Sequence, residues 1–291
     1  MSNLPRNGRP YAKLASQLFA WACAACAFSS IAILALLLSQ MLYFAWGWLD
    51  WQFLTSFDSQ LSPHKAGVRA ALVGSIYLIL LTTLFAVPIG VGAAIYLEEY
   101  AQRSRWRGIV QTNIANLAGV PSIVYGILGL GLFVRGMQMG AGVLAGALTL
   151  TLVVLPIVIL ASQEALRAVP STIRQASYAL GATKLDVTVG VIVPAALSGI
   201  MASFILAIAR AVGETMAVAL AAGKRPQMTL NPLDSIQTMT AYIVETSKGD
   251  NPQGTLGYQT IFAVGLTLFL CTLALNVLAQ WILKRMREQY E

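Results

Sequence analysis

The stretch VPSTIRQASYALGATKLDVTVGVIVP, residues Val169–Pro194, is a polar, charged segment between two long apolar runs. It includes Arg174 and Lys184 and has little continuous apolar surface, so it does not suit the interior of a bilayer. The runs on either side, Gly142–Ser162 and Val193–Ala222, are each long enough to cross a membrane, which takes roughly 20 apolar residues. A structured polar loop between two membrane spans predicts a partner for that loop.

The rest of the chain has the composition of a membrane protein. Hydrophobic residues make up 57% of its 291 residues and charged residues 11%, whereas soluble domains carry about 25% charged residues. Its apolar stretches of spanning length are continuous rather than alternating, which predicts an all-α membrane protein with six transmembrane helices. The six stretches are Leu18–Trp46, Leu72–Leu97, Val110–Val134, Gly142–Ser162, Val193–Ala222 and Tyr258–Leu283.

Basic residues set the expected orientation of these spans. If both termini lie inside, the cytoplasmic segments hold twelve lysines and arginines and the outer segments hold six. We therefore expect a multi-pass protein with its N- and C-termini in the cytoplasm. The same asymmetry explains most of the net charge of +7, so this charge does not require nucleic acid as a partner.

No Gly/Ser-rich linker or low-complexity tract divides the chain, which predicts one membrane domain with an extra helix in front. We expect residues 1–66 to form an N-terminal tail, the first transmembrane helix and an outer loop. Residues 67–291 then form the main membrane domain, with the polar loop at 163–194. Glycines within its spans permit close helix–helix contact. These are Gly126, Gly129, Gly131, Gly142 and Gly146.

No catalytic constellation is visible, and we expect neither an enzyme nor a cofactor site in this chain. His64 is the only histidine, which excludes a metal centre built from histidines. Cys23 and Cys26 form a C-x-x-C pair inside the first apolar stretch, with no basic neighbour to favour a thiolate. The chain has no G-x-x-x-x-G-K-[ST] loop, so it is not expected to bind ATP itself.

Arg210 and Glu214 are ionisable residues deep in the fifth apolar stretch. A charge there costs at least about 2.5–3.5 kcal/mol on insertion scales, so such residues are functional candidates. Their i, i+4 spacing predicts that they share one helical face and can pair. Two interpretations stay open: the pair only neutralises itself or bridges helices, or it serves a substrate path or its gate.

The polar loop itself predicts two short helices. Ser171 or Thr172 can cap a helix that runs to Leu180, and Gly181 provides a turn that a side chain would hinder. A second short helix then leads to Pro194. At the end of the second span, Glu98 and Glu99 are expected to be solvated.

The loop resembles the EAA loop of ABC importer permeases. Gln175, Ala176 and Ser177, then Gly181 with Ala182, then Val191 and Val193-Pro194 keep the spacing of that motif. Further segments resemble the phosphate-specific permeases of this family, some of them the A type and some the C type, so the subtype stays open. These segments are Gly90–Ala101, Val120–Phe133, Arg210–Gly223 and Met239–Asp250.

The resemblance implies a type I (MetI-like) permease core of five helices plus an N-terminal helix, in the bacterial cytoplasmic (inner) membrane. It implies one permease half of an ATP-driven importer of inorganic phosphate. Its implied partners are a second, similar permease, two ATPase subunits that hold ATP and Mg²⁺, and an extracytoplasmic phosphate-binding protein. The implied ATPase-coupling residues are those at Gln175, Ala176, Ser177, Gly181, Ala182 and Pro194.

One departure and two alternatives remain. The first position of the loop motif is often Glu in the family, and here it is Gln175. A permease for another oxyanion, such as sulfate, molybdate or phosphonate, would share the same plan. A secondary anion transporter driven by an ion gradient would suit Arg210 and Glu214, but it would not need the polar loop and would be expected to show inverted repeats.

Overall fold

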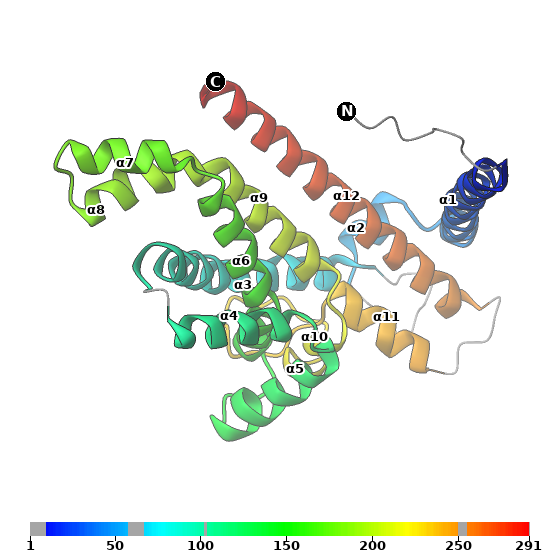
Figure 1. Ribbon diagram of the computed structural model, residues 1–291. Helices are drawn as coiled ribbons and strands as arrows, with labels where there is room; N and C mark the ends of the chain where they lie inside the picture. Colours follow the sequence, from blue (N-terminus) through cyan, green and yellow to red (C-terminus); the bar gives the residue numbers. More distant parts are fainter. Residues whose placement is uncertain (1–9, 58–66, 102–103, 250–254, 291) are drawn as a thin grey trace.

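The computed structural model of the chain describes residues 10–57, 67–101, 104–249 and 255–290, and every regular element in these ranges is helical (Figure 1). The N-terminal elements are α1 (Pro10–Ala45), α2 (Trp51–Thr55), α3 (Arg69–Ile95) with the π-helical turn η2 (Tyr96–Tyr100), α4 (Arg105–Ala118), and α5 (Ser122–Gly129) with η3 (Leu130–Gly136). The remaining elements are α6 (Val143–Arg167), α7 (Ser171–Ala179), α8 (Lys184–Val187), η4 (Thr188–Ile192), α9 (Val193–Val212), α10 (Met216–Ala221), α11 (Met239–Lys248) and α12 (Leu256–Tyr290).

Five of the helical stretches are long and apolar enough to cross a membrane, and a bent pair of helices provides a sixth. The five are Leu14–Ala45, Arg69–Tyr100, Val143–Arg167, Lys184–Val212 and Leu256–Arg285. The all-α membrane fold expected from the sequence is confirmed. In Figure 1, α7 and α8 lie at one end of the helical domain, which we call the loop side, and α11 lies toward the other end.

The third predicted span, Val110–Val134, is a bent pair of helices, α4 followed by α5 and η3. The chain bends by 100° between α4 and α5, because Pro121 holds an extended backbone conformation at the start of α5 and has no N–H to continue α4. Across the bend the Tyr125 hydroxyl donates to the Leu117 carbonyl oxygen at 2.9 Å. This bond fixes α5 relative to α4.

The fifth predicted span, Val193–Ala222, was also wrong in its limits. The helix starts earlier, because α8, η4 and α9 run on from Lys184 as one span, and it ends at Val212. A short connection then leads into α10. The domain boundaries expected at residues 66 and 67 stay a prediction.

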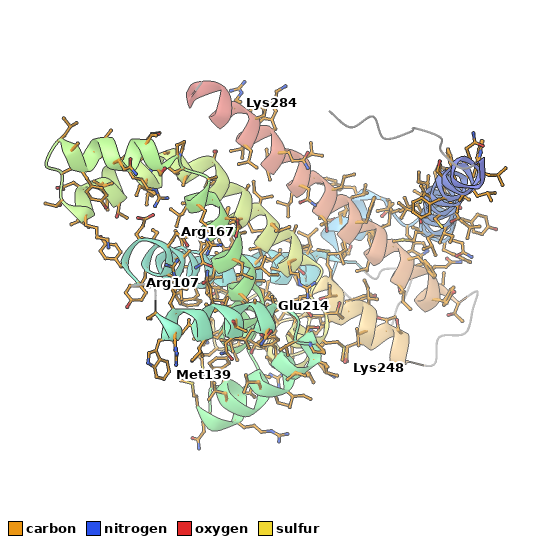
Figure 2. All side chains as sticks on the ribbon, viewed as in Figure 1. Arg107, Met139, Arg167, Glu214, Lys248 and Lys284 are labelled. Carbon is orange, nitrogen blue, oxygen red and sulfur yellow. The ribbon has the colours of Figure 1, made fainter. Side chains whose placement is uncertain are left out.

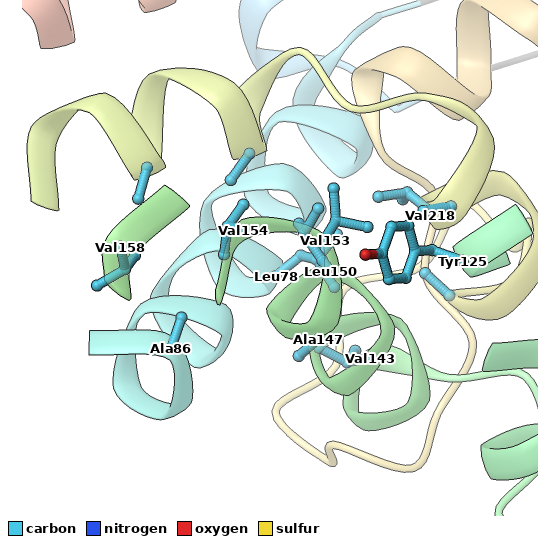
Figure 3. Packing of buried hydrophobic residues seen from close by; sticks show 14 of the residues in the cluster. Leu78, Ala86, Tyr125, Val143, Ala147, Leu150, Val153, Val154, Val158 and Val218 are labelled. Atoms are coloured by element: carbon cyan, nitrogen blue, oxygen red, sulfur yellow. The ribbon is translucent and has the colours of Figure 1, made fainter. Parts of the chain in front are cut away.

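The centre of the domain is α6, which is the most buried of the spanning helices. Its valines and leucines pack against α3, α5, α9 and α10, as the close view shows (Figure 3). Glycines permit this packing: a Cβ on Gly126 would lie 3.1 Å from the Ala217 Cα of α10, and one on Gly129 would overlap Thr149 of α6. Close helix–helix contact is likewise confirmed at Gly146, beside Leu78 of α3. Gly142 instead meets the Leu233 carbonyl oxygen in the connection between α10 and α11, and Gly131 has no neighbour within 4 Å of its Cβ position.

The first helix, α1, stands apart from this core (Figure 1). It joins the rest of the chain at its C-terminal end, where Phe44 packs on Tyr258 and Phe262 of α12, with ring centroids 5.6 and 4.9 Å apart. The remainder of its apolar surface is exposed in the single chain. The extra helix in front of the main domain is therefore present as expected.

Candidate functional site

The EAA-type loop, residues 163–194, folds into two short helices joined by a tight turn. Gly181 has a φ of +83°, a left-handed conformation that a side chain would strain, so the turn expected there is confirmed. The cap expected at Ser171 or Thr172 was wrong: α7 begins at Ser171 itself, after Pro170 in an extended conformation, and no side chain caps it.

The cap that sequence reasoning missed belongs to the second helix. Thr183 and Asp186 form a capping box: the Asp186 backbone N–H donates to Thr183 Oγ1 at 3.3 Å and the Thr183 N–H donates to Asp186 Oδ2 at 3.1 Å. The spacing T-x-x-D is a known helix-start signal and could have located it. This box starts the continuous helix that becomes α9, so the second half of the loop is rigidly joined to a membrane span.

The loop presents apolar side chains to its surroundings. Leu180 is 89% exposed and Leu185 62% exposed, and Ile173 and Tyr178 are also exposed. Of the motif residues, Gln175, Ala176, Gly181 and Pro194 are exposed, whereas Ser177 and Ala182 are partly buried. An apolar surface on a polar loop is the kind of surface that a protein partner covers.

The glutamates at the end of α3 are not solvated, contrary to expectation. The side chain of Glu99 is 6% exposed and accepts a hydrogen bond from Arg174 of α7 at 2.5 Å. The side chain of Glu98 is 15% exposed and pairs with Arg107 of α4 at 3.2 Å and with Arg167 of α6 at 3.0 Å. Composition gave no signal for these pairs, and two of them, Glu98–Arg167 and Glu99–Arg174, join residues 69 and 75 positions apart.

An apolar layer lies beneath these ion pairs. It is formed by residues from α3 and η2, the second half of α6 and the turn after it, α8, η4 and α9, namely Ala94, Leu97, Ile159, Leu166, Val169, Val187, Ile192, Ala196 and Ile200. Lys184 of α8 adds a contact from above, with its Nζ 5.0 Å from the centre of the Tyr100 ring. We call this layer together with its ion pairs the loop-side cluster.

Arg210 and Glu214 do not lie on one helical face, so the expected pairing was wrong. The helix α9 ends at Val212, Gly213 caps it, and Glu214 lies in the connection to α10. Glu214 is buried, with 8% of its surface exposed, whereas Arg210 is exposed in the last turn of α9. Within the described ranges, no ion pair joins the two residues.

Polar groups that the sequence did not single out surround the connection between α9 and α10. The Thr240 hydroxyl donates to the Glu214 carbonyl oxygen at 3.2 Å, and the Met239 N–H donates to Ser75 Oγ at 2.9 Å. Gln237 is buried, and among the described residues its Oε1 has no hydrogen-bond partner. In Figure 2 Glu214 lies near α10 and α11, well away from Arg107 and Arg167. The connection between α9 and α10 is thus separate from the loop-side cluster.

Comparison with known proteins identifies the family. The family model described as the binding-protein-dependent transport system inner membrane component matches residues 86–288. The chain is 31% identical to the phosphate transport system permease protein PstC of Mesorhizobium japonicum, over 80% of this chain and 78% of that protein. It is 33% identical to the phosphate transport system permease protein PstA 1 of Mycobacterium tuberculosis (strain CDC 1551 / Oshkosh), over 74% and 70%.

A third relative, the probable ABC transporter permease protein YqgH of Bacillus subtilis, is 32% identical over 80% of this chain and 78% of that protein. Among solved structures, a chain of the bacterial alginate ABC transporter in complex with its alginate-bound periplasmic protein superposes with a TM-score of 0.70, at 13% identity, over 96% of this chain and 98% of that one. A chain of the MetNI methionine ABC transporter gives 0.62, at 16% identity, over 75% and 95%. The protein therefore belongs to the binding-protein-dependent inner-membrane permeases of ABC importers and has their type I fold.

Proposed function

We propose that the chain is one of two permease subunits of an ATP-driven importer that carries inorganic phosphate across the cytoplasmic membrane. The observation that carries the proposal is the identity of 31–33%, over about three quarters or more of the chain, to proteins named as phosphate transport permeases. Because these relatives include both PstA and PstC proteins, the proposal does not depend on the subtype.

The position of Arg210 gives this function a physical basis. Its side chain is exposed in the single chain although it lies in a helix of spanning length. A charge that faces lipid at the centre of a membrane helix costs about 2.5–3.5 kcal/mol, and for this reason arginines within membrane helices almost always face protein or a water-filled cavity. A guanidinium binds phosphate oxygens through two parallel hydrogen bonds. In this proposal Arg210 faces the substrate path at the interface with the second permease.

Glu214 has the complementary role of a gate residue in this proposal. It lies where one helix stops and another begins, and the connection is held by Thr240. A buried carboxylate beside the path disfavours an anion that has lost its water. A small movement of α10 relative to α9 would change the distance between Glu214 and Arg210, and with it the affinity of the path for phosphate.

The remaining partners follow from the family and the loop. Membership of a binding-protein-dependent family implies an ATPase and a substrate-binding protein. We propose that two ATPase subunits, which hold ATP and Mg²⁺, cover the exposed Leu180 and Leu185 of the EAA-type loop. That loop and both termini would then lie in the cytoplasm, in agreement with the distribution of basic residues. The phosphate-binding protein would dock on the opposite side, where Leu230 is exposed.

Transport by the purified complex in vesicles tests the proposal. Radiolabelled phosphate and sulfate are compared with the matching binding proteins outside and ATP inside. Phosphate should accumulate only with ATP and the binding protein. A complex that carries sulfate and not phosphate would be a permease for another oxyanion, and uptake driven by an ion gradient without ATP would contradict an ATP-driven importer.

A further inference from the structure

The ion pairs of the loop-side cluster form two sets that hold different elements. Glu98 forms ion pairs with Arg107 and Arg167, so it joins α3 to α4 and α6. Among the described residues, Glu99 pairs with Arg174 alone, so it joins α3 to α7, the first helix of the EAA-type loop. Of these two adjacent residues in one π-helical turn, Glu98 therefore holds the helices of the domain together, whereas Glu99 holds the EAA-type loop.

Arg174 connects three elements through one side chain. Its Nη1 donates to Glu99 Oε1 of η2, and its Nη2 donates to the Leu166 carbonyl oxygen near the end of α6, both at 2.5 Å. The carbonyls of a last helical turn have no partner within the helix, and the negative end of the helix dipole favours a cation there. Because the guanidinium is planar and its donors are fixed in direction, it cannot keep both bonds if α7 moves relative to the domain.

The rest of α7 is weakly attached. None of its residues is buried, and within the described part of the chain the only side-chain hydrogen bonds or ion pairs that leave it are those of Arg174. The helix is bounded by Pro170 at one end and by the turn at Gly181 at the other. Without Arg174 it would be held mainly by these two turns.

The helix α3 also packs against α9, the helix that carries Arg210. Thr82 and Ala86 of α3 line a narrow gap together with Ala207 and Ala211 of α9, directly beside Arg210 in the sequence. The helical stretch from Arg69 to Tyr100 is unbroken, although Pro88 and the π-helical turn lie within it, so its two ends stay mechanically connected. Displacement of the Glu99 end of α3 is therefore passed to the part of α9 next to Arg210.

We infer that the Arg174–Glu99 pair is the link through which movement of α7 is passed to α3, and that Glu99 is a positioning residue for transport. The inference rests on the proposed function, in which an ATPase moves the EAA-type loop. It assigns to the end of α3 a part in coupling that the loop motif does not include. It also predicts that, without this pair, the complex stays assembled and hydrolyses ATP, but hydrolysis no longer drives transport.

The test uses Glu99→Gln and Arg174→Gln in the full reconstituted complex, with Glu98→Gln as the matched control. The control removes the same charge from the neighbouring residue but leaves the link to α7 intact. The number of phosphate ions carried per ATP hydrolysed should fall about tenfold in the two link variants, since a lost hydrogen bond between charged groups is worth that factor or more. Glu98→Gln should keep the ratio of the unaltered complex.

Hydrogen–deuterium exchange of the peptide that contains residues 171–179 gives a second readout that needs no substrate. Exchange should rise in Glu99→Gln and Arg174→Gln and stay unchanged in Glu98→Gln. An unchanged exchange rate and an unchanged transport ratio in Glu99→Gln would overturn the inference, as would equal uncoupling by Glu98→Gln. If the unaltered complex carries no phosphate, the proposed function fails, and the exchange measurement still decides whether the link exists.

Discussion

The loop-side cluster and the connection between α9 and α10 both contain charged residues, but they differ in how those charges are satisfied. In the loop-side cluster Glu98 and Glu99 are each matched by arginines at 2.5–3.2 Å. At the connection, Glu214 is buried and Arg210 exposed, and among the described residues neither has an ion pair. Charges satisfied within one chain hold its elements together, whereas unmatched charges need a ligand, water or a second subunit.

The largest expected effect concerns Arg210. Replacing it by Gln removes a charge that makes no ion pair in the described chain, so assembly should be preserved. Phosphate uptake should fall about 10- to 100-fold or more, because hydrogen bonds to a charged group are worth about 1.5–3 kcal/mol. Initial uptake rates in vesicles measure this, with Arg210→Lys as the control that keeps the charge. Uptake at the unaltered rate would remove Arg210 from the path.

The next prediction tests whether close packing of α5 against α10 stabilises the connection between α9 and α10. In Gly126→Ala the added Cβ would lie 2.8 Å from Leu220 Cδ1 and 3.1 Å from the Met216 carbonyl oxygen. Such overpacking costs about 1–3 kcal/mol of unfolding free energy, so the unfolding midpoint of the solubilised complex should drop. Gly131→Ala is the matched control, since nothing lies within 4 Å of its Cβ position. Equal midpoints for the two variants would contradict this packing.

A smaller effect is expected at the turn of the EAA-type loop. No atom lies within 4 Å of a Cβ on Gly181, so Gly181→Val acts through its backbone alone, at φ +83°. A left-handed conformation costs an ordinary residue about 1–2 kcal/mol. We expect normal membrane insertion, with weaker ATPase binding or with ATP hydrolysis that no longer drives transport. Gly181→Asn should be milder because Asn tolerates this conformation, and an unchanged transport rate in Gly181→Val would exclude the turn from the mechanism.

The smallest effect separates the two helix starts of the loop. Thr183→Ala removes a capping box and should lower stability by about 0.5–2 kcal/mol. Ser171→Ala should have no such effect, because Ser171 caps nothing. Amide exchange in the two loop helices measures both variants side by side. Faster exchange after Ser171→Ala than after Thr183→Ala would reverse the assignment of the cap.

The sequence was sufficient for the fold but not for the pairing of charges. Continuous apolar stretches locate membrane helices because the bilayer imposes a length and a composition, and Gly181 was recognisable because few residues replace glycine in a left-handed turn. The break after Val212 was missed, because it interrupts a stretch whose hydropathy stays high, whereas the bend at Pro121 has a local cause in a residue without a backbone N–H. The pairs Glu98–Arg167 and Glu99–Arg174 depend on tertiary contacts between distant segments, which no local pattern records. For Arg210 and Glu214, helical spacing misled because the helix ends between them.

Water accessibility at position 210 tests the central contrast most directly. All three native cysteines are first replaced, and Arg210→Cys and Leu84→Cys are then treated in the assembled complex with a charged, membrane-impermeant thiol reagent. Both positions are exposed in the single chain, but Leu84 lies on an apolar face of α3. We expect Arg210→Cys to react, while Leu84→Cys stays unmodified. An unreactive Arg210→Cys would show that the unmatched charge faces protein or lipid and not a path for phosphate.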